Sequence, residues 1–168
     1  MPITREFLSQ YVLPTFVESG TYRCEAVDLA RDLGFQSIYT MDIEKKYVDA
    51  AKAKGYNAYC GDSPDILAKI LPGIEGPITF WLDAHPFAKP MDIFQTRFPL
   101  MRELRAIRKH ANAEEHVILM DDMRILGDWE KELLLYGMEL LWPHAELRWH
   151  GDRYCKDDIL CCDLRGAQ

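Results

Sequence analysis

The chain has 168 residues, of which 48% are hydrophobic, and 27 acidic against 20 basic residues give a formal charge of −7. This size and composition suit a single domain over residues 1–168 with a sizeable core. The negative charge argues against a nucleic acid as partner. We expect no membrane association, because no apolar run approaches the ~20 residues of a membrane span and the first ten residues lack the apolar centre of a signal peptide.

The cysteines point to a reducing compartment. Five cysteines are an odd number and lack the spacing of a disulfide framework, which predicts free thiols and a cytoplasmic protein. Cys161 and Cys162 are neighbours in an expected strand, so their side chains should point to opposite faces of a sheet. We therefore expect two buried small residues there and no shared metal site.

Short apolar runs alternate with helix-like segments along the chain. Strands are expected at residues 15–18, 37–41, 57–60, 78–82, 117–120, 145–149 and 159–164. Helices are expected at residues 22–33, 45–54, 64–71, 99–110 and 128–141. Ser63 is the expected N-cap of the third helix, with Pro64 at its first position. Residues 84–98 form the longest irregular segment, and loops of this length often act as lids.

Strands separated by helices of about 10 to 15 residues indicate βαβ units and a parallel sheet. The runs ITFWL and VILM are continuously apolar, as buried parallel strands are. No helix separates the last two strands, so an antiparallel C-terminal hairpin is expected at one edge. The predicted fold is α/β, a Rossmann-like, doubly wound and mostly parallel sheet with helices on both faces.

Each of the first five strands ends in an acidic or small polar group. Doubly wound sheets bind ligands beyond the carboxyl ends of their strands, and carboxylates that converge there repel one another unless a ligand or cation offsets the charge. The groups are Glu18-Ser19-Gly20-Thr21, Asp42, Asp62-Ser63, Asp83 and Asp121-Asp122.

Asp83, Asp121 and Asp122 follow two strands that should be neighbours. Three carboxylates make an oxygen-rich site, which suits Mg²⁺, Mn²⁺ or Ca²⁺ and disfavours Zn²⁺. The alternative is structural: one of the adjacent pair caps the next helix or binds loop amides.

The first turn, ESGTY, separates classes of cofactor. It lacks both the GxGxxG of dinucleotide-binding turns and the GxxxxGK[ST] of P-loops. Gly20 permits one close backbone approach, while Glu18 would repel a pyrophosphate but could hold an ammonium group. The turn therefore favours a ligand with an amino group, unless Gly20 only serves a tight strand-to-helix turn.

The series FVESGTY, IYTMDIEKKYVDAA, AYCGDSPDIL, FWLDAHP and VILMDDMR resembles the class I S-adenosylmethionine-dependent methyltransferases over residues 14–164. The resemblance implies a seven-stranded sheet whose last strand is antiparallel. It also implies a cofactor site with the methionine end at Glu18, Ser19, Gly20 and Thr21, the ribose at Asp42, the adenine at Asp62 and Ser63, and the reacting end at Asp83.

The three acids are similar to those of metal-dependent O-methyltransferases such as catechol and macrocin O-methyltransferases. That similarity implies a divalent cation, Mg²⁺ or another, which binds a substrate hydroxyl and lowers its pKa. His85 is the candidate general base, with Asp83 beside it, because imidazole titrates near neutral pH; the alternative is a histidine that orders the loop. The acceptor would be a small molecule or sugar.

Because the chain is short, the sequence does not show which residues would cover a bound substrate. Phe87, Phe94 and Phe98 would form an apolar wall or pack as core. There is also room for a homo-oligomer whose partner subunit completes the pocket.

Two other functions fit parts of the pattern. One is a non-catalytic cofactor-binding or regulatory module of the same fold. The other is a metal-dependent hydrolase that uses Asp83, His85, Asp121 and Asp122. Glu18 and Asp42 argue against a hydrolase, because that reaction needs no partner for a ribose.

Overall fold

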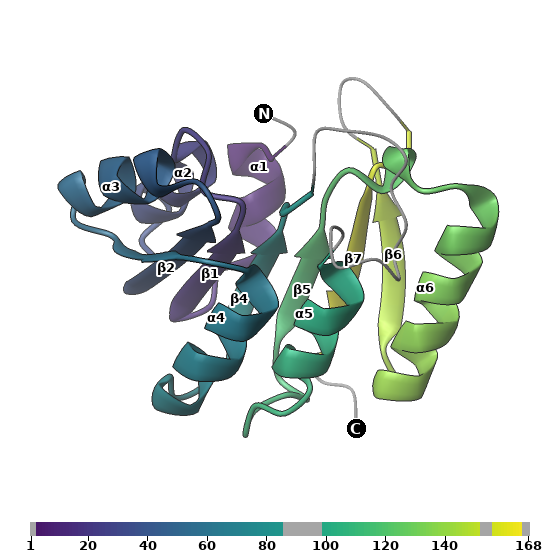
Figure 1. The fold of residues 1–168 in the computed structure, drawn as a ribbon. Helices are drawn as coiled ribbons and strands as arrows, with labels where there is room; N and C mark the ends of the chain where they lie inside the picture. The colour runs from purple at the N-terminus through teal and green to yellow at the C-terminus, as the bar shows by residue number, and fades with distance from the viewer. Residues whose placement is uncertain (1–2, 86–98, 152–155, 166–168) are drawn as a thin grey trace.

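A seven-stranded sheet runs through the centre of the molecule in the order β3-β2-β1-β4-β5-β7-β6 (Figure 1). The computed structural model describes residues 3–85, 99–151 and 156–165. The strands are β1 (Thr15–Ser19), β2 (Ser37–Asp42), β3 (Asn57–Cys60), β4 (Ile78–Leu82), β5 (Val117–Met120), β6 (Glu146–His150) and β7 (Ile159–Asp163). Strands β1 to β5 pair in parallel, and β7 is antiparallel to both β5 and β6. The predicted doubly wound sheet with its antiparallel hairpin is confirmed.

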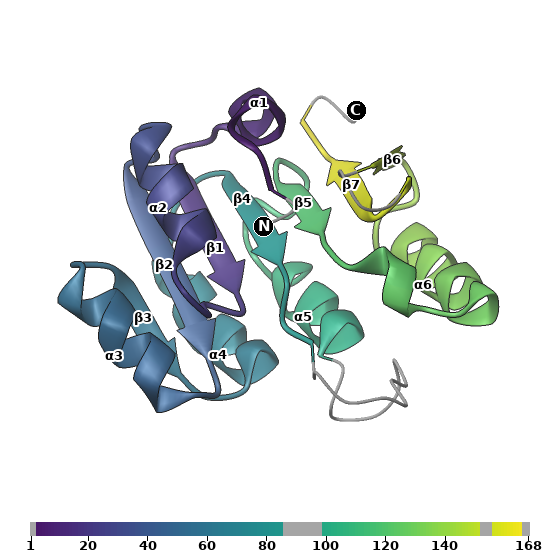
Figure 2. The same cartoon turned by 90° about the horizontal axis from the view of Figure 1, so that it is seen from above.

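Helices cover both faces of this sheet, as predicted (Figure 2). They are α1 (Arg5–Leu8), α2 (Glu25–Asp32), α3 (Lys45–Ala53), α4 (Ser63–Ile70), α5 (Leu100–Ile107) and α6 (Asp128–Leu141), with 3₁₀ turns η1 (Ser9–Tyr11), η2 (Leu71–Gly73) and η3 (Met123–Ile125). Helices α1, α2 and α3 pack on one face and α4, α5 and α6 on the other. Within the described ranges, no helix is long and apolar enough to cross a membrane.

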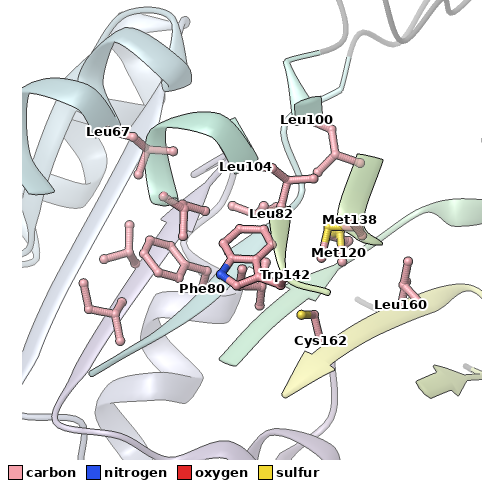
Figure 3. Close-up of a cluster of buried hydrophobic side chains, with 14 of the residues drawn as sticks. Leu67, Phe80, Leu82, Leu100, Leu104, Met120, Met138, Trp142, Leu160 and Cys162 are labelled. Atoms are coloured by element: carbon pink, nitrogen blue, oxygen red, sulfur yellow. The ribbon is translucent and has the colours of Figure 1, made fainter. Parts of the chain in front are cut away.

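The two faces bury separate apolar clusters. Side chains alternate along a strand, so Phe16 joins the cluster under α2 while Val17 joins the cluster under α4, α5 and α6. Figure 3 shows the cluster under α4, α5 and α6, in which the Trp142 side chain is buried. Cys161 and Cys162 are both buried and belong to opposite clusters, as the strand pattern predicted.

The predicted strands agree with the structure within a residue or two, but helix starts differ. The helix expected from Tyr22 begins at Glu25, because Tyr22 and Cys24 have φ angles of 38° and 67°, which no right-handed helix accepts. The N-cap of α4 is Asp62, and Ser63 is already its first residue, so that prediction was wrong. The short helix α1 was missed because four residues carry no helical period.

Several sequence predictions lie outside the described residues. Only residues 84 and 85 of the expected lid are described, and Phe87, Phe94, Phe98 and Cys155 fall in the undescribed ranges. The polar groups at the ends of β1 to β5 are all described. Together they form what we call the carboxyl-end rim.

Candidate active site

The turn after β1 brings two strand ends into contact. Gly20 has a φ of +92° and its amide donates to the Met41 carbonyl at 2.9 Å. A Cβ atom on Gly20 would lie 2.7 Å from the backbone oxygen of Asp83, which is closer than real Cβ contacts allow. Both the conformation and the contact therefore require glycine. The tight turn considered from the sequence is therefore present, and the segment that approaches Gly20 closely is the Asp83 backbone.

Glu18 points to the α2 side of the sheet and is 2% exposed. The Thr40 hydroxyl donates to its Oε2 at 2.6 Å, and the Thr21 hydroxyl lies 2.6 Å from that of Thr40. Burial raises the pKa of Glu18 well above its ordinary value, although the Thr40 hydrogen bond opposes the shift and Asp83 adds to it. A cationic ligand beside Glu18 would favour the ionised carboxylate again.

A cavity of about 180 Å³ opens beside Glu18. Its walls include Gly20, Arg23, Trp81 and Asp83. Pockets for whole drug-sized ligands measure roughly 300 to 1,000 Å³. The cavity is therefore large enough for one end of a larger ligand, and that end could be about the size of an amino acid. Its wall offers the acidic side chain of Glu18 and the basic side chain of Arg23.

Asp42 holds the loop after β2 and the loop after β1 together. Its Oδ2 accepts from the Tyr22 amide at 3.1 Å, and its Oδ1 accepts from the Glu44 amide at 2.8 Å. The side chain is half-buried. Each carboxylate oxygen has a second lone pair, so this geometry leaves capacity for hydroxyl groups such as those of a ribose.

Asp62 and Ser63 lie at the junction of β3 and α4. Arg102 from α5 donates to Asp62 Oδ2 at 2.6 Å and to Asp65 at 3.1 Å. The sequence predicted a helix over residues 99–110 but no partner for Arg102, so this contact was missed. Asp62 at the rim is therefore already paired with Arg102.

A second buried carboxyl group was also missed. Glu103 on α5 is 1% exposed. Its Oε1 and the buried Ser19 hydroxyl have no hydrogen-bond partner in the part of the chain that the structure describes. Burial raises the pKa of Glu103 to about 7, against the opposing effect of the neighbouring Ser63 hydroxyl. A glutamate on the apolar face of a helix was the available sequence signal.

The three acids predicted to bind a cation, Asp83, Asp121 and Asp122, are divided between two groups of candidate ligands. Candidate ligand atoms of Asp83, His85 and Asp122 lie within 4.8 Å of one another, and so do those of Asp121, Asp122 and Asp158. His85 Nε2 pairs with Asp122 and lies 3.7 Å from Asp83 Oδ1. Asp122 is thus common to both groups, and Asp158 is an acid that the sequence did not single out.

Asp121 and Asp122 differ in whether neighbouring groups stabilise a negative charge on the carboxylate. Asp121 Oδ1 accepts from the Asp122 amide at 2.7 Å, while its Oδ2 is buried with no partner among the described residues. Burial and the neighbouring carboxylates raise the pKa of Asp121 to about 8 and that of Asp83 to about 7. For Asp122 the effect of burial is outweighed by His85 and Arg124, and its pKa is lowered.

The sequence also allowed a structural role for Asp121 or Asp122, as a helix cap or as an acceptor for loop amides. The structure shows only part of that role. Asp122 precedes η3, but its side chain makes no capping hydrogen bond. Its φ of 58° is rare for a residue other than glycine, and such conformations cluster at functional sites. Asp121 does bind a loop amide, yet that bond uses only one of its two oxygens.

Comparison with known proteins places this geometry on a familiar scaffold. No protein-family model and no curated protein sequence matches the chain. Among solved structures, human methyltransferase-like protein 13 in complex with SAH matches with a TM-score of 0.65 at 15% identity, over 99% of this chain and 78% of that one.

Two bacterial enzymes match comparably. The O-methyltransferase from Bacillus cereus in complex with SAH has a TM-score of 0.64 at 14% identity, over 95% of this chain and 78% of that one. The O-methyltransferase TomG from Streptomyces achromogenes, involved in tomaymycin synthesis and bound to SAM, gives 0.64 at 13%, over 96% and 78%. The chain therefore has the class I methyltransferase fold that its sequence resemblance implied.

Proposed function

We propose that the protein is an S-adenosylmethionine-dependent methyltransferase that methylates a hydroxyl of a small molecule or sugar with the help of a divalent cation. The observation that carries the proposal is the cavity between the Gly20 turn and Asp83, with buried Glu18 in its wall. The cavity lies where strand order reverses, between β1 and β4, which is where doubly wound sheets bind ligands.

The residues around this cavity fit the cofactor. Glu18 would take the ammonium group of the methionine end, and Arg23 offers the opposite charge for its carboxylate. Asp42 would accept from the ribose hydroxyls, and Ser63 with Asp62 would lie beside the adenine. Bound at this rim, S-adenosylmethionine supplies an electrophilic methyl group, and the chain's task is to hold it in line with the acceptor.

The acid cluster fits a hard cation. Among the described residues Asp121 Oδ2 has no hydrogen-bond partner, and burial together with the neighbouring Asp122 raises the pKa of Asp83 to about 7. A divalent cation at these oxygens would act as a Lewis acid toward a substrate hydroxyl. Oxygen donors from aspartates suit Mg²⁺ or Mn²⁺.

His85 would handle the hydroxyl proton of the acceptor. A carboxylate can only accept, so Nε2 carries the hydrogen toward Asp122 and Asp122 fixes the orientation of the ring. The same ring lies beside Asp83, at the reacting end. We infer that Asp122 orients His85 through Nε2–H, and that the hydroxyl proton of the acceptor would go to Nδ1, the ring nitrogen that carries no hydrogen in this tautomer.

Calorimetric titration of S-adenosylmethionine, with Mg²⁺ and then with a chelator, tests the proposal. We expect micromolar binding that falls at least about tenfold in Glu18→Gln, which keeps shape and removes the charge. Glu146→Gln, an exposed glutamate on β6 with an arginine partner of its own, is the matched control. No binding to the unchanged protein would refute the cofactor assignment.

A second measurement separates an enzyme from a binding module. Transfer of labelled methyl groups to a panel of catechols and sugars, with Mg²⁺ present, should show turnover that Asp83→Asn abolishes. Tight cofactor binding without turnover on any acceptor would favour the non-catalytic module instead.

A further inference from the structure

Strand β6 is the last strand of the sheet, at the end away from β3 (Figure 1). It pairs with β7 on one side, and among the described residues no strand pairs with its other edge. An unpaired edge presents backbone N–H and C=O groups that a further strand can bind, and folded proteins usually protect such edges. The outer edge of β6 is therefore a place where another strand could add to the sheet.

The sequence at this edge is complementary to itself when it is reversed. The chain reads AELRW from Ala145 to Trp149. Two copies placed antiparallel about Leu147 would set Glu146 of one copy opposite Arg148 of the other. The small Ala145 would then lie opposite the large Trp149. Opposite charges directly across two antiparallel strands stabilise the pair, and a pair of identical strands has the two-fold symmetry of most homodimers.

The charged side chains of β6 are available at the surface. Glu146 and Arg148 are two residues apart and therefore lie on the same face of the strand. Arg148 Nε donates to Glu146 Oε1 at 3.0 Å, and its Nη2 donates to Oε2 at 2.6 Å. The side chains are 66% and 50% exposed. The two groups that pair within one chain could therefore pair between two chains without loss of a buried contact.

The opposite face of β6 carries apolar surface. Leu147 and Trp149 pack against the core under α4, α5 and α6 but remain partly exposed. Leu147 also lines a groove of about 580 Å³ between β6 and α6, together with Trp142 and with Tyr136, which is 57% exposed. A second copy paired with β6 would bring its own groove against this one. Apolar surface that now faces water would be covered, which favours association.

Two acids act against this pairing. Glu132 and Glu139 of α6 also line the groove. Both copies would bring these side chains to the same seam, where like charges repel one another. The backbone hydrogen bonds, the apolar contact and two Glu146–Arg148 pairs have to outweigh that repulsion, so we expect a dimer of micromolar rather than nanomolar affinity.

We propose that the protein forms a symmetric homodimer in which the two β6 edges pair antiparallel about Leu147. The sheet would then run continuously through both copies. Strands β5 and β7 lie between β6 and β4, so each carboxyl-end rim would be formed by one chain alone. The interface is separate from the cavity beside Glu18, and this inference does not rest on the proposed function.

Sedimentation equilibrium of the full chain, combined with a charge swap, tests the proposal. The unchanged protein should approach twice the mass of the chain as its concentration rises. Glu146→Arg alone and Arg148→Glu alone should each raise the dissociation constant at least about tenfold, because each places two pairs of like charges at the seam. An equimolar mixture of the two variants should dimerise again, since the arginines of one then face the glutamates of the other.

The matched control is Lys45→Glu, which reverses a charge in an exposed ion pair on α3 and should leave the dissociation constant unchanged. Both β6 side chains are exposed, so the variants should fold, and circular dichroism checks this. A chain that stays monomeric at its highest soluble concentration would overturn the proposal. So would a dimer that persists in both single variants, or one that the mixture fails to restore. Calorimetry with S-adenosylmethionine reports separately on the proposed function.

Discussion

The two ends of the sheet differ in whether their buried polar side chains have hydrogen-bond partners. At the amino ends of β4 and β5, His116 Nδ1 accepts from the Ile78 amide at 3.1 Å, and its Nε2 lies 3.0 Å from His110 Nδ1. His110 Nε2 in turn lies 2.8 Å from the Ile74 carbonyl oxygen. Each ring nitrogen has a partner, and together the rings tie β4 and β5 to the segment before each strand.

The carboxyl-end rim leaves such groups unsatisfied. Among the described residues, the buried side-chain atoms without a hydrogen-bond partner are Ser19 Oγ, Glu103 Oε1 and Asp121 Oδ2, and all three belong to the rim or face it. An orphaned buried polar atom costs roughly 1 to 3 kcal/mol. The comparison teaches that the amino end is built for stability, whereas the rim retains the capacity to bind a ligand.

The largest expected effect is on cation binding at the rim. Asp121→Asn should lower Mn²⁺ affinity by about 100-fold, because it removes the charge of an oxygen that has no partner among the described residues. In the absence of metal the same variant should be at least as stable as the unchanged protein at pH 8, since it also removes a buried carboxyl. Equilibrium Mn²⁺ titration and thermal unfolding measure the two effects, with exposed Asp49→Asn as control.

The amino end should show the reverse behaviour. His116→Ala should lower the free energy of unfolding by about 3 kcal/mol, because it leaves the Ile78 amide and the His110 ring without partners and opens a cavity. S-adenosylmethionine affinity of the folded variant should stay within about twofold. Urea unfolding checks the first statement against exposed His144→Ala, and calorimetry checks the second; a large loss of cofactor affinity would erase the contrast between the two ends.

A pH series would sharpen the comparison at Glu103. Its pKa is raised to about 7 in the folded protein, against about 4.3 in an unfolded chain. The stability that protonation provides is therefore fully present below about pH 4 and is lost as pH rises through 7. Relative to Glu103→Gln, the unchanged protein should lose about 2 to 3 kcal/mol between pH 4 and pH 8. Parallel pH curves for the two proteins in urea unfolding would show that Glu103 ionises normally.

The smallest effect concerns Arg23 at the mouth of the cavity. It lies beside the exposed Tyr22 ring, 5.1 Å from its centroid, so solvent weakens any ion pair that it makes. Arg23→Ala should weaken S-adenosylmethionine binding about threefold to tenfold in calorimetry. It should leave the binding of adenosine, which has no carboxylate, unchanged; an equal loss for both ligands would place Arg23 elsewhere than at the methionine end.

The sequence by itself determined the strands, the order of helices and strands, and most of the rim. These follow from local causes: continuous apolar runs such as VILM must be buried, and parallel strands must all end at one edge. It was therefore predictable that Gly20, Asp42, Asp83 and Asp121 lie at one edge of the sheet. The cavity of about 180 Å³ beside Glu18 fits the amino-group ligand that the first turn favoured.

Only the tertiary structure decided which partners these residues have. Asp158 precedes β7, and because β7 is antiparallel to β5 its beginning, not its end, lies at the rim. Arg102 and Glu103 reach the rim from a helix whose orientation no local pattern fixes. The partners of each carboxylate depend on such contacts between distant segments, and so the ion pairs of Arg124 with Asp122 and Asp158 could not be seen in the sequence.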